Sequence, residues 1–239
     1  MINPSRVSRR SRTSDANKMG RIWKNNSLSI VLFALFFLCL SGQYLAGWYS
    51  HNEGQREHHR PETSFSGYVI EAHFLEALFE NWESEFLQIG AFVILTAFLF
   101  QKGSAESKPL DKKERVDEIK SDSVYDPKMP WPVRQRGLAL TLYSYSSSIA
   151  VLLLFVLSFV LHGLSGARHY NQDQFEHGQP AVSTVEYMST STFWFESFQN
   201  WQSEFLSIAV MVVFTIFLRQ IGSPESKPVD TPHGETGSN

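Results

Sequence analysis

Two long stretches of this chain carry no lysine, arginine, aspartate or glutamate, and they restrict its fold more than any other feature. They are residues 27–49 and residues 138–167. A helix needs about 20 apolar residues to cross a bilayer, so each stretch is long enough to do so. Two shorter apolar blocks occupy residues 86–100 and 205–218. Four such blocks predict an all-α membrane protein, although the mean hydropathy of -0.19 taken alone suggests a soluble one.

The second half of the chain repeats the first. Residues 27–111 align without a gap with residues 146–230, at an offset of 119. Such self-similarity indicates a tandem duplication of a two-helix unit. Each unit has an even number of spans, so both copies face the same way and the repeats are parallel. Two motifs recur with the repeat: NWxSEFL at 81–87 and 200–206, and GSxESKP at 103–109 and 222–228.

The duplication divides the chain into five segments. We expect a disordered basic tail on the cytoplasmic side, a first repeat with two spans, a cytoplasmic linker that leads into the third span, a second repeat with two spans, and a disordered C-terminal tail. In order, these segments are residues 1–26, 27–111, 112–145, 146–230 and 231–239.

Basic residues predict the orientation. Lysine and arginine gather in the first tail, in the linker and after the last apolar block, whereas the other two loops carry only Arg56, Arg60 and Arg168. Positive charge marks the cytoplasmic side, so we expect both termini in the cytoplasm. The first block is read as a true span, not a signal peptide, because its repeat partner lies in the middle of the chain.

The two short apolar blocks can cross the membrane only if their helices also include the residues that precede them, at their outer ends. Fifteen helical residues rise only about 22 Å, against a hydrocarbon core of about 30 Å. These preceding residues are those of NWxSEFL, which places Glu85 and Glu204 at the outer boundary. Charged groups facing lipid are costly, so we predict that a polar stripe on each helix faces an outward-opening vestibule. The stripes consist of Asn81, Glu85, Gln88, Asn200, Glu204 and Ser207.

The residues around these stripes complete the predicted outer face. Trp82 and Trp201 are expected to anchor the helices at the interface, where indole rings are favoured. The preceding stretch, residues 68–80, is amphipathic by pattern. It lies either on the outer leaflet as a helix of its own or forms a long extension of the span.

Several roles are open for the two vestibule glutamates. They can brace their own helices, handle protons or cations, or contribute to a surface for a partner. Two nearby carboxylates rarely both stay ionised, which would suit proton handling. Loop residues offer pairing alternatives, and these candidate loop partners are Glu57, His58, Glu176 and His177.

The outer loops are rich in histidine and acidic residues, but their spacing fits no strong zinc signature. We therefore expect solvated loop residues, with no metal and no cofactor. The glycines of GSxESKP, Gly103 and Gly222, suit a left-handed helix end. The lysines of the same motif, Lys108 and Lys227, are expected to reach lipid headgroups.

With its duplicated NWxSEFL and GSxESKP motifs, the chain resembles an uncharacterised family of bacterial inner-membrane proteins, a domain of unknown function. The resemblance covers residues 27–230. It implies a bacterial, four-helix protein of the inner membrane and no known activity.

Taken together, these features predict a non-enzymatic bundle in the lipid bilayer that assembles with itself or with a membrane partner and does not bind nucleic acid. The alternative is a proton- or cation-linked channel or transporter that uses Glu85 and Glu204. An enzyme ranks third, because no nucleophile–base set is evident.

Overall fold

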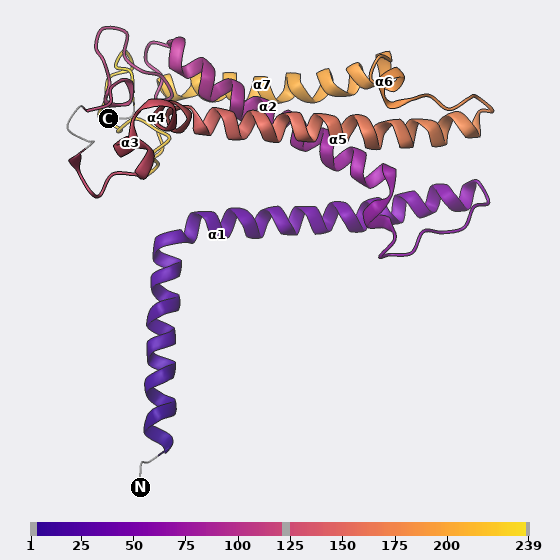
Figure 1. The fold of residues 1–239 in the computed structure, drawn as a ribbon, viewed down its shortest axis with the longest axis horizontal. Coiled ribbons are helices and arrows are strands. Elements are labelled where there is room, and N and C mark those ends of the chain that lie inside the picture. The colour runs from indigo at the N-terminus through magenta and orange to yellow at the C-terminus, as the bar shows by residue number, and fades with distance from the viewer. Residues whose placement is uncertain (1–3, 121–124, 238–239) are drawn as a thin grey trace. The chain divides into compact units, whose positions relative to one another are not determined.

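The computed structural model describes residues 4–120 and 125–237, with side chains from residue 20 onward. The outermost residues of both predicted disordered tails, 1–3 and 238–239, lie outside the described residues. Every regular element in the described ranges is helical (Figure 1). The α-helices are α1 (Pro4–Glu57), α2 (Ala72–Phe98), α3 (Trp131–Gln135), α4 (Gly137–Ser144), α5 (Ser146–Glu176), α6 (Thr184–Tyr187) and α7 (Ser191–Phe217), and the 3-10 turns are η1 (Tyr68–Ile70) and η2 (Arg115–Asp117).

Within the described residues, three helices are long and apolar enough to cross a membrane: residues Gly20–Glu57 of α1, the whole of α5 and the whole of α7. Helix α2 is not among them, although it has 27 residues like α7, with which it aligns at the offset of 119. The reason lies in its sequence, because α2 carries Glu76, Glu80, Glu83 and Glu85 within three turns. The structure thus confirms the all-helical class with long apolar helices.

Helix α1 bends at Asn26, whose backbone has φ −135° and ψ 15°, outside the helical region. The Asn26 side-chain amide donates to the carbonyl of Ile22 at 3.0 Å, one turn earlier. The bend is visible as the corner of the indigo helix (Figure 1). It falls directly before Ser27, where the first apolar stretch begins. The helical backbone also extends back to Pro4, into the segment for which the sequence predicts disorder.

The chain forms two compact units, residues 1–74 and 75–239. The first unit has an aromatic core around Tyr44, whose ring lies 5.1 to 5.4 Å from the rings of Phe65, Tyr68 and Phe74. Tyr68 is 1 % exposed. Its hydroxyl approaches Gly47 so closely that a Cβ there would lie 2.5 Å away. Side chains of η1 and the start of α2 therefore pack against the C-terminal half of α1.

A loop clamp joins α1 to the segment that follows it. The side chain of Asn52 accepts from the backbone N–H of Thr63 at 2.8 Å and donates to the Thr63 carbonyl at 3.0 Å. In the second unit, Asn171 makes the same pair of hydrogen bonds to Val182, at 2.8 and 2.9 Å. The two asparagines are 119 residues apart, and so are their partners.

The close approach of glycine to tyrosine recurs at the same offset. A Cβ on Gly166 would lie 2.5 Å from the hydroxyl of Tyr187, as a Cβ on Gly47 would from that of Tyr68. Tyr187 is 1 % exposed and packs with Ala167 and Phe193 in the core of the second unit. A small residue on each long helix thus makes room for a buried tyrosine.

The second unit is built on α2, α5 and α7. Helix α5 runs antiparallel to the other two, because Phe159 packs on Phe193 and Phe155 packs on Trp201 further along α7. Gly90 of α2 permits a close approach to α5, since a Cβ there would meet Val151 and Leu152 at 3.4 Å. Figure 1 shows α5 and α7 side by side.

The residues that precede each short apolar block belong to the same helix as the block. Of the two predicted alternatives for residues 68–80, the structure has the long extension from Ala72 onward, because α2 is continuous from Ala72 to Phe98, whereas Tyr68–Ile70 form the separate turn η1. Ahead of α7, Ser183 caps the short α6 by accepting from the N–H of Glu186.

The GSxESKP motifs form two similar turns. Gly103 has φ +89° and Gly222 has φ +81°, which confirms the predicted left-handed backbone. The helices end earlier, at Phe98 and Phe217, so each glycine lies in the turn that follows its helix. Lys227 is 1 % exposed and donates to three backbone carbonyls. It therefore ties down residues 232–235, whereas we expected it to reach lipid headgroups.

Candidate functional site

A buried carboxylate–imidazole pair joins α2 to α5. His162 Nδ1 donates to Glu83 Oε2 at 2.7 Å, and both side chains are at most 1 % exposed. The second oxygen of Glu83 accepts from the indole N–H of Trp201 at 2.9 Å. One carboxylate on α2 therefore holds a side chain from each of the two other long helices of this unit.

Aromatic rings close this pair off. The ring of Phe193 lies 4.8 Å from the imidazole of His162, and it is fully buried. Phe193 in turn packs edge-on against Tyr187 at 5.5 Å. A buried carboxylate with so little water around it is stabilised only when its oxygens are hydrogen-bonded. The partners of Glu83 meet that requirement on both of its oxygens.

A second group of ionisable residues lies two turns along α2. Glu76 is 9 % exposed and pairs with His169 Nδ1 of α5. The hydroxyl of Tyr187 reaches Glu76 at 3.2 Å and Glu196 of α7 at 2.9 Å. We call these residues, together with Glu83 and His162, the buried cluster; its members are Glu76, Glu83, His162, His169, Tyr187 and Glu196.

Tyr187 is the neutral hydrogen-bond donor of the buried cluster. Burial raises the pKa of Tyr187 above its ordinary value, and the negative charges of Glu76 and Glu196 raise it further. The hydroxyl therefore keeps its proton at physiological pH. It has one proton for two carboxylates, so it satisfies only one of them at a time.

Amide side chains extend the polar contacts along α2 and α7. Asn200 donates to Glu80 Oε1. Further toward the C-terminal end of α2, Gln88 donates to the hydroxyl of Ser207 at 2.8 Å and to the carbonyl of Glu204 at 3.0 Å. Hydrogen bonds between α2 and α7 thus run from Glu80 to Gln88 of α2.

The six predicted vestibule residues do not form one group. Gln88 contacts Glu204 and Ser207. Asn200 contacts Glu80, which was not among the predicted site residues. Asn81 is exposed and donates back to the Ala77 carbonyl at 2.6 Å. Glu85 is exposed, and Glu204 is half-buried.

The two predicted anchors are half-buried, and the predicted loop partners are exposed. Trp82 is half-buried, with its ring 5.9 Å from that of Phe79, and Trp201 is the donor to Glu83 described above. The ring nitrogen Nδ1 of His177 donates to the Asp173 carbonyl, one turn earlier, at 2.8 Å. All four candidate loop partners are exposed: Glu57, His58, Glu176 and His177.

Sequence reasoning missed the most buried ionisable residues, yet the sequence holds a signal for them. Glu76, Glu80 and Glu83 are spaced by four and three, the same spacing that singled out the stripe one face away. His162 stands inside an otherwise apolar stretch. An ionisable residue within such a stretch is a candidate functional residue by default.

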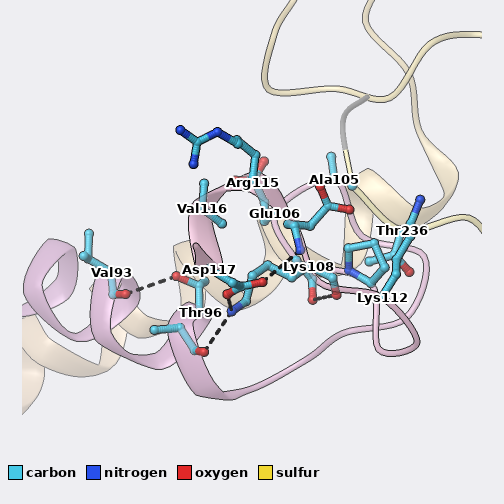
Figure 2. Close-up of a pocket in the computed structure, with 15 residues that line it drawn as sticks. Val93, Thr96, Ala105, Glu106, Lys108, Lys112, Arg115, Val116, Asp117 and Thr236 are labelled. Atoms are coloured by element: carbon cyan, nitrogen blue, oxygen red, sulfur yellow. Dashed lines mark hydrogen bonds and ion pairs between the residues drawn. The ribbon is translucent and has the colours of Figure 1, made fainter. Parts of the chain in front are cut away.

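A separate pocket of about 610 Å³ lies near the first GSxESKP turn (Figure 2). Its wall carries Glu106, Lys108, Lys112, Arg115 and Asp117. The hydrogen bond from Lys108, 2.6 Å long, holds the pKa of the Asp117 carboxyl below its usual range. Because this cation is already paired, the pocket offers a mixed surface with no clear preference for an anion. The buried cluster is therefore the stronger candidate site.

The chain was compared with known families, curated proteins and solved structures. A family model described as a domain of unknown function (DUF6766) matches residues 19–238. No curated protein and no solved structure matches the chain.

Proposed function

The chain belongs to the family of the domain of unknown function DUF6766, and from that premise we propose that it is an integral membrane protein with four spans. Three of the spans are the long apolar helices of α1, α5 and α7. The fourth is α2, the repeat partner of α7. The basic residues of the tail, linker and C-terminal segment favour the cytoplasm for both termini. The resemblance to uncharacterised bacterial inner-membrane proteins implies a bacterial inner membrane.

The depth of the buried pair supports α2 as a span. Fifteen residues separate Glu83 from Phe98, the last residue of α2, a rise of about 22 Å. Sixteen residues separate His162 from Ser146, the first residue of α5, a rise of about 24 Å. The two helices therefore place their paired groups at matching heights above the cytoplasmic ends. Both heights fall inside a hydrocarbon core of about 30 Å.

The glutamates of α2 do not oppose this assignment, because the most buried of them have partners. Glu83 is bonded to His162 and Trp201, and Glu76 to His169 and Tyr187. Ionisable residues in spans face the bundle interior and pair with one another. A hydropathy average treats these glutamates as if they faced lipid. Their side chains instead contact residues of α5, α6 and α7.

The function we propose is non-enzymatic: a duplicated helical bundle that assembles with itself or with a membrane partner. The observation that carries it is the Glu83–His162 pair, because it fixes α2 against α5 at one register. Buried polar groups of this kind specify register in some proteins, at a cost in desolvation. The repeated asparagines and glutamates of NWxSEFL, with Glu85 and Glu204 among them, then line the outward-facing vestibule.

Purification in mild detergent tests the assembly. We expect a defined oligomer or a copurifying membrane protein by light scattering and mass spectrometry. Glu83→Gln should shift that oligomer toward smaller species if the pair fixes the assembling surface, whereas Glu85→Gln, on the exposed side of the same helix, should not. A lone monodisperse monomer from the parent protein contradicts the proposal.

Cation-linked transport is the second candidate, and the excess of carboxylates over imidazoles in and beside the buried cluster favours it. In this version Glu85 and Glu204 form the entrance. The test is proton or cation flux in liposomes, comparing the parent with the double variant Glu85→Gln/Glu204→Gln. Absence of flux in the parent rules against transport.

A further inference from the structure

Three donor side chains in the second unit come together from three different helices. A carboxylate oxygen of Glu76 in α2, a ring nitrogen of His162 in α5 and a carboxylate oxygen of Glu196 in α7 all lie within 4.8 Å of one another. In a tetrahedral metal site with bonds near 2.1 Å, neighbouring donor atoms are about 3.4 Å apart. Small side-chain rotations would therefore bring the three donor atoms to the distances needed to coordinate one ion.

The Nε2 atom of His162 points to such an ion. Its side chain is 0 % exposed, and Nε2 has no hydrogen-bond partner. The other ring nitrogen donates to the carboxylate of Glu83, which leaves the lone pair of the neutral imidazole on Nε2. A buried polar atom without a partner costs free energy, so it calls for a ligand. A metal ion satisfies this lone pair directly.

The charge of the region also favours a cation. Glu76, Glu80, Glu83 and Glu196 stand against two imidazoles, His162 and His169, in this network of contacts. Even with both imidazoles protonated, two negative charges remain in excess. Glu76 and Glu196 share a single tyrosine proton, as described above. With His162 neutral as a metal ligand and His169 protonated, a divalent ion between these two carboxylates relieves their repulsion and lowers the excess from three negative charges to one.

We propose that Glu76, His162 and Glu196 bind a divalent first-row transition metal ion, with zinc as the representative ion. Mixed imidazole and carboxylate donors suit this class, whereas magnesium and calcium prefer oxygen donors alone. Three protein ligands leave one position open in a tetrahedral site. The ion sits at the interface of α2, α5 and α7 and joins all three helices.

The surrounding contacts are those that metal sites use to orient their ligands. His162 is held by Glu83, in the carboxylate–histidine arrangement common behind metal-bound imidazoles. Glu83 is held in turn by the indole of Trp201, at 2.9 Å. Glu76 and Glu196 are positioned by the hydroxyl of Tyr187. Glu83 and Tyr187 are therefore positioning residues of the proposed site.

The duplication predicts one site per chain. At the offset of 119 residues, the counterparts of Glu76, His162 and Glu196 are Phe195, Gln43 and Ala77. None of these three residues is a carboxylate or an imidazole, so the pseudosymmetric position lacks the donor set. The site also differs from the loop histidines, for which the sequence analysis expects no metal.

Zinc titration of the full-length protein, purified in detergent and stripped with a chelator, tests the proposal. Competition with a chromogenic zinc indicator measures stoichiometry and affinity. We expect one zinc ion per chain, and at least a tenfold loss of affinity in each of His162→Gln, Glu76→Gln and Glu196→Gln. Glu83→Gln, which removes only the orienting carboxylate, should weaken zinc about tenfold and keep the stoichiometry.

Two matched controls distinguish the buried site from the surface. Glu85→Gln removes an exposed carboxylate from the same helix as Glu76, and His177→Ala removes an exposed loop histidine. Both should bind zinc within about twofold of the parent. Loss of zinc in His177→Ala with retention in Glu76→Gln and Glu196→Gln would assign binding to the loops and overturn the proposal. No stoichiometric zinc in the parent would overturn it as well.

Cobalt provides a direct test of ligation that does not depend on affinity. In a Cys39→Ser background, which removes the single native cysteine, His162→Cys should give a thiolate-to-cobalt charge-transfer band. The same background without the second substitution should give only ligand-field bands. Absence of the charge-transfer band in a protein that still binds cobalt contradicts ligation at residue 162. This readout does not depend on the number of spans, so it can fail while the proposed topology holds.

Discussion

Glu83 and His162 face each other across α2 and α5 with 2.7 Å between Oε2 and Nδ1, and neither is open to solvent. Removing one partner leaves the other buried and uncompensated. Glu83→Ala should therefore lower the free energy of unfolding by about 3–5 kcal/mol. Thermal or denaturant unfolding in detergent measures the change.

The matched control for that variant is Glu85→Ala, which truncates an exposed glutamate two residues away. It should change stability by no more than about 0.5 kcal/mol. The double variant Glu83→Ala/His162→Ala should lose less than the sum of the two single variants, because the groups interact. Additive losses would show that the pair is not coupled.

Because Gly47 lies so close to the Tyr68 hydroxyl, Gly47→Ala should destabilise the protein, and a second substitution at Tyr68 should restore part of the lost stability. In Gly47→Ala the new Cβ would lie 2.5 Å from the tyrosine hydroxyl but 3.3 Å or more from its ring carbons. The ring cannot move freely, because Tyr44 and Phe74 pack against it. We expect a loss of about 1–3 kcal/mol from overpacking.

Adding Tyr68→Phe to Gly47→Ala removes the clashing atom and should restore part of the loss, measured by the same unfolding assay. Gly42→Ala is the comparison within α1, because nothing lies within 4 Å of a Cβ at that position. It should be neutral or slightly stabilising, since alanine favours the helix. A destabilised Gly42→Ala, or no recovery in the double variant, would count against the packing described.

The two asparagine clamps should differ in strength. Asn52 is 3 % exposed, whereas Asn171 is half-buried, although both make the same two hydrogen bonds. Asn52→Ala leaves the part-buried N–H of Thr63 unpaired, while the Thr63 carbonyl keeps its second donor, the Trp48 indole, at 2.8 Å. An unpaired N–H of this kind costs about 1–3 kcal/mol. Asn52→Ala should therefore raise hydrogen exchange in residues 58–66 more than Asn171→Ala raises it in residues 177–185. Equal effects in the two loops would contradict the difference in burial.

Alkaline conditions should destabilise the first unit through Tyr68. Burial, followed by the charge of Glu71, raises the pKa of Tyr68 from 10.0 to about 12. Below pH 10.0 the phenol is neutral in both states, so its contribution to stability is fully present. Between pH 10.0 and about 12 only the unfolded state loses the proton, and stability falls by up to about 1.4 kcal/mol per pH unit.

Comparing the parent with Tyr68→Phe between pH 9 and 12 isolates this effect. The variant should show a smaller loss of stability over that interval, because it has no phenol to ionise. Parallel pH profiles for the two proteins would mean that Tyr68 titrates in the folded state as it does in the unfolded one.

The sequence predicted the helical class and the long apolar helices, because uncharged stretches such as residues 27–49 leave few alternatives. It also predicted left-handed backbone at Gly103 and Gly222, but as helix C-caps, whereas both lie in turns that follow helices ending at Phe98 and Phe217. It did not locate the buried cluster. Periodicity gives the face on which Glu83 lies, but not which face meets a neighbouring helix.

That choice depends on tertiary contacts that no local pattern encodes. His162 comes from the other half of the chain, and its contact with Glu83 requires α5 to run antiparallel to α2 at one register. The stripe that contains Glu85 has the same spacing as the stripe that contains Glu83, yet Glu85 is exposed. Packing of α2 against α5 and α7 therefore selects between two stripes that look equivalent in the sequence.

The central claim is that α2 crosses the membrane with Glu83 enclosed among the other helices. Cysteine labelling in intact cells measures this directly. In a Cys39→Ser background, Ser66→Cys precedes α2 and Lys112→Cys follows it, and both positions are exposed. A membrane-impermeant thiol reagent should label residue 66 from outside and residue 112 only after the membrane is opened, while Glu83→Cys stays unlabelled in both cases. Labelling of residues 66 and 112 from the same side, or ready labelling of residue 83, would contradict the account.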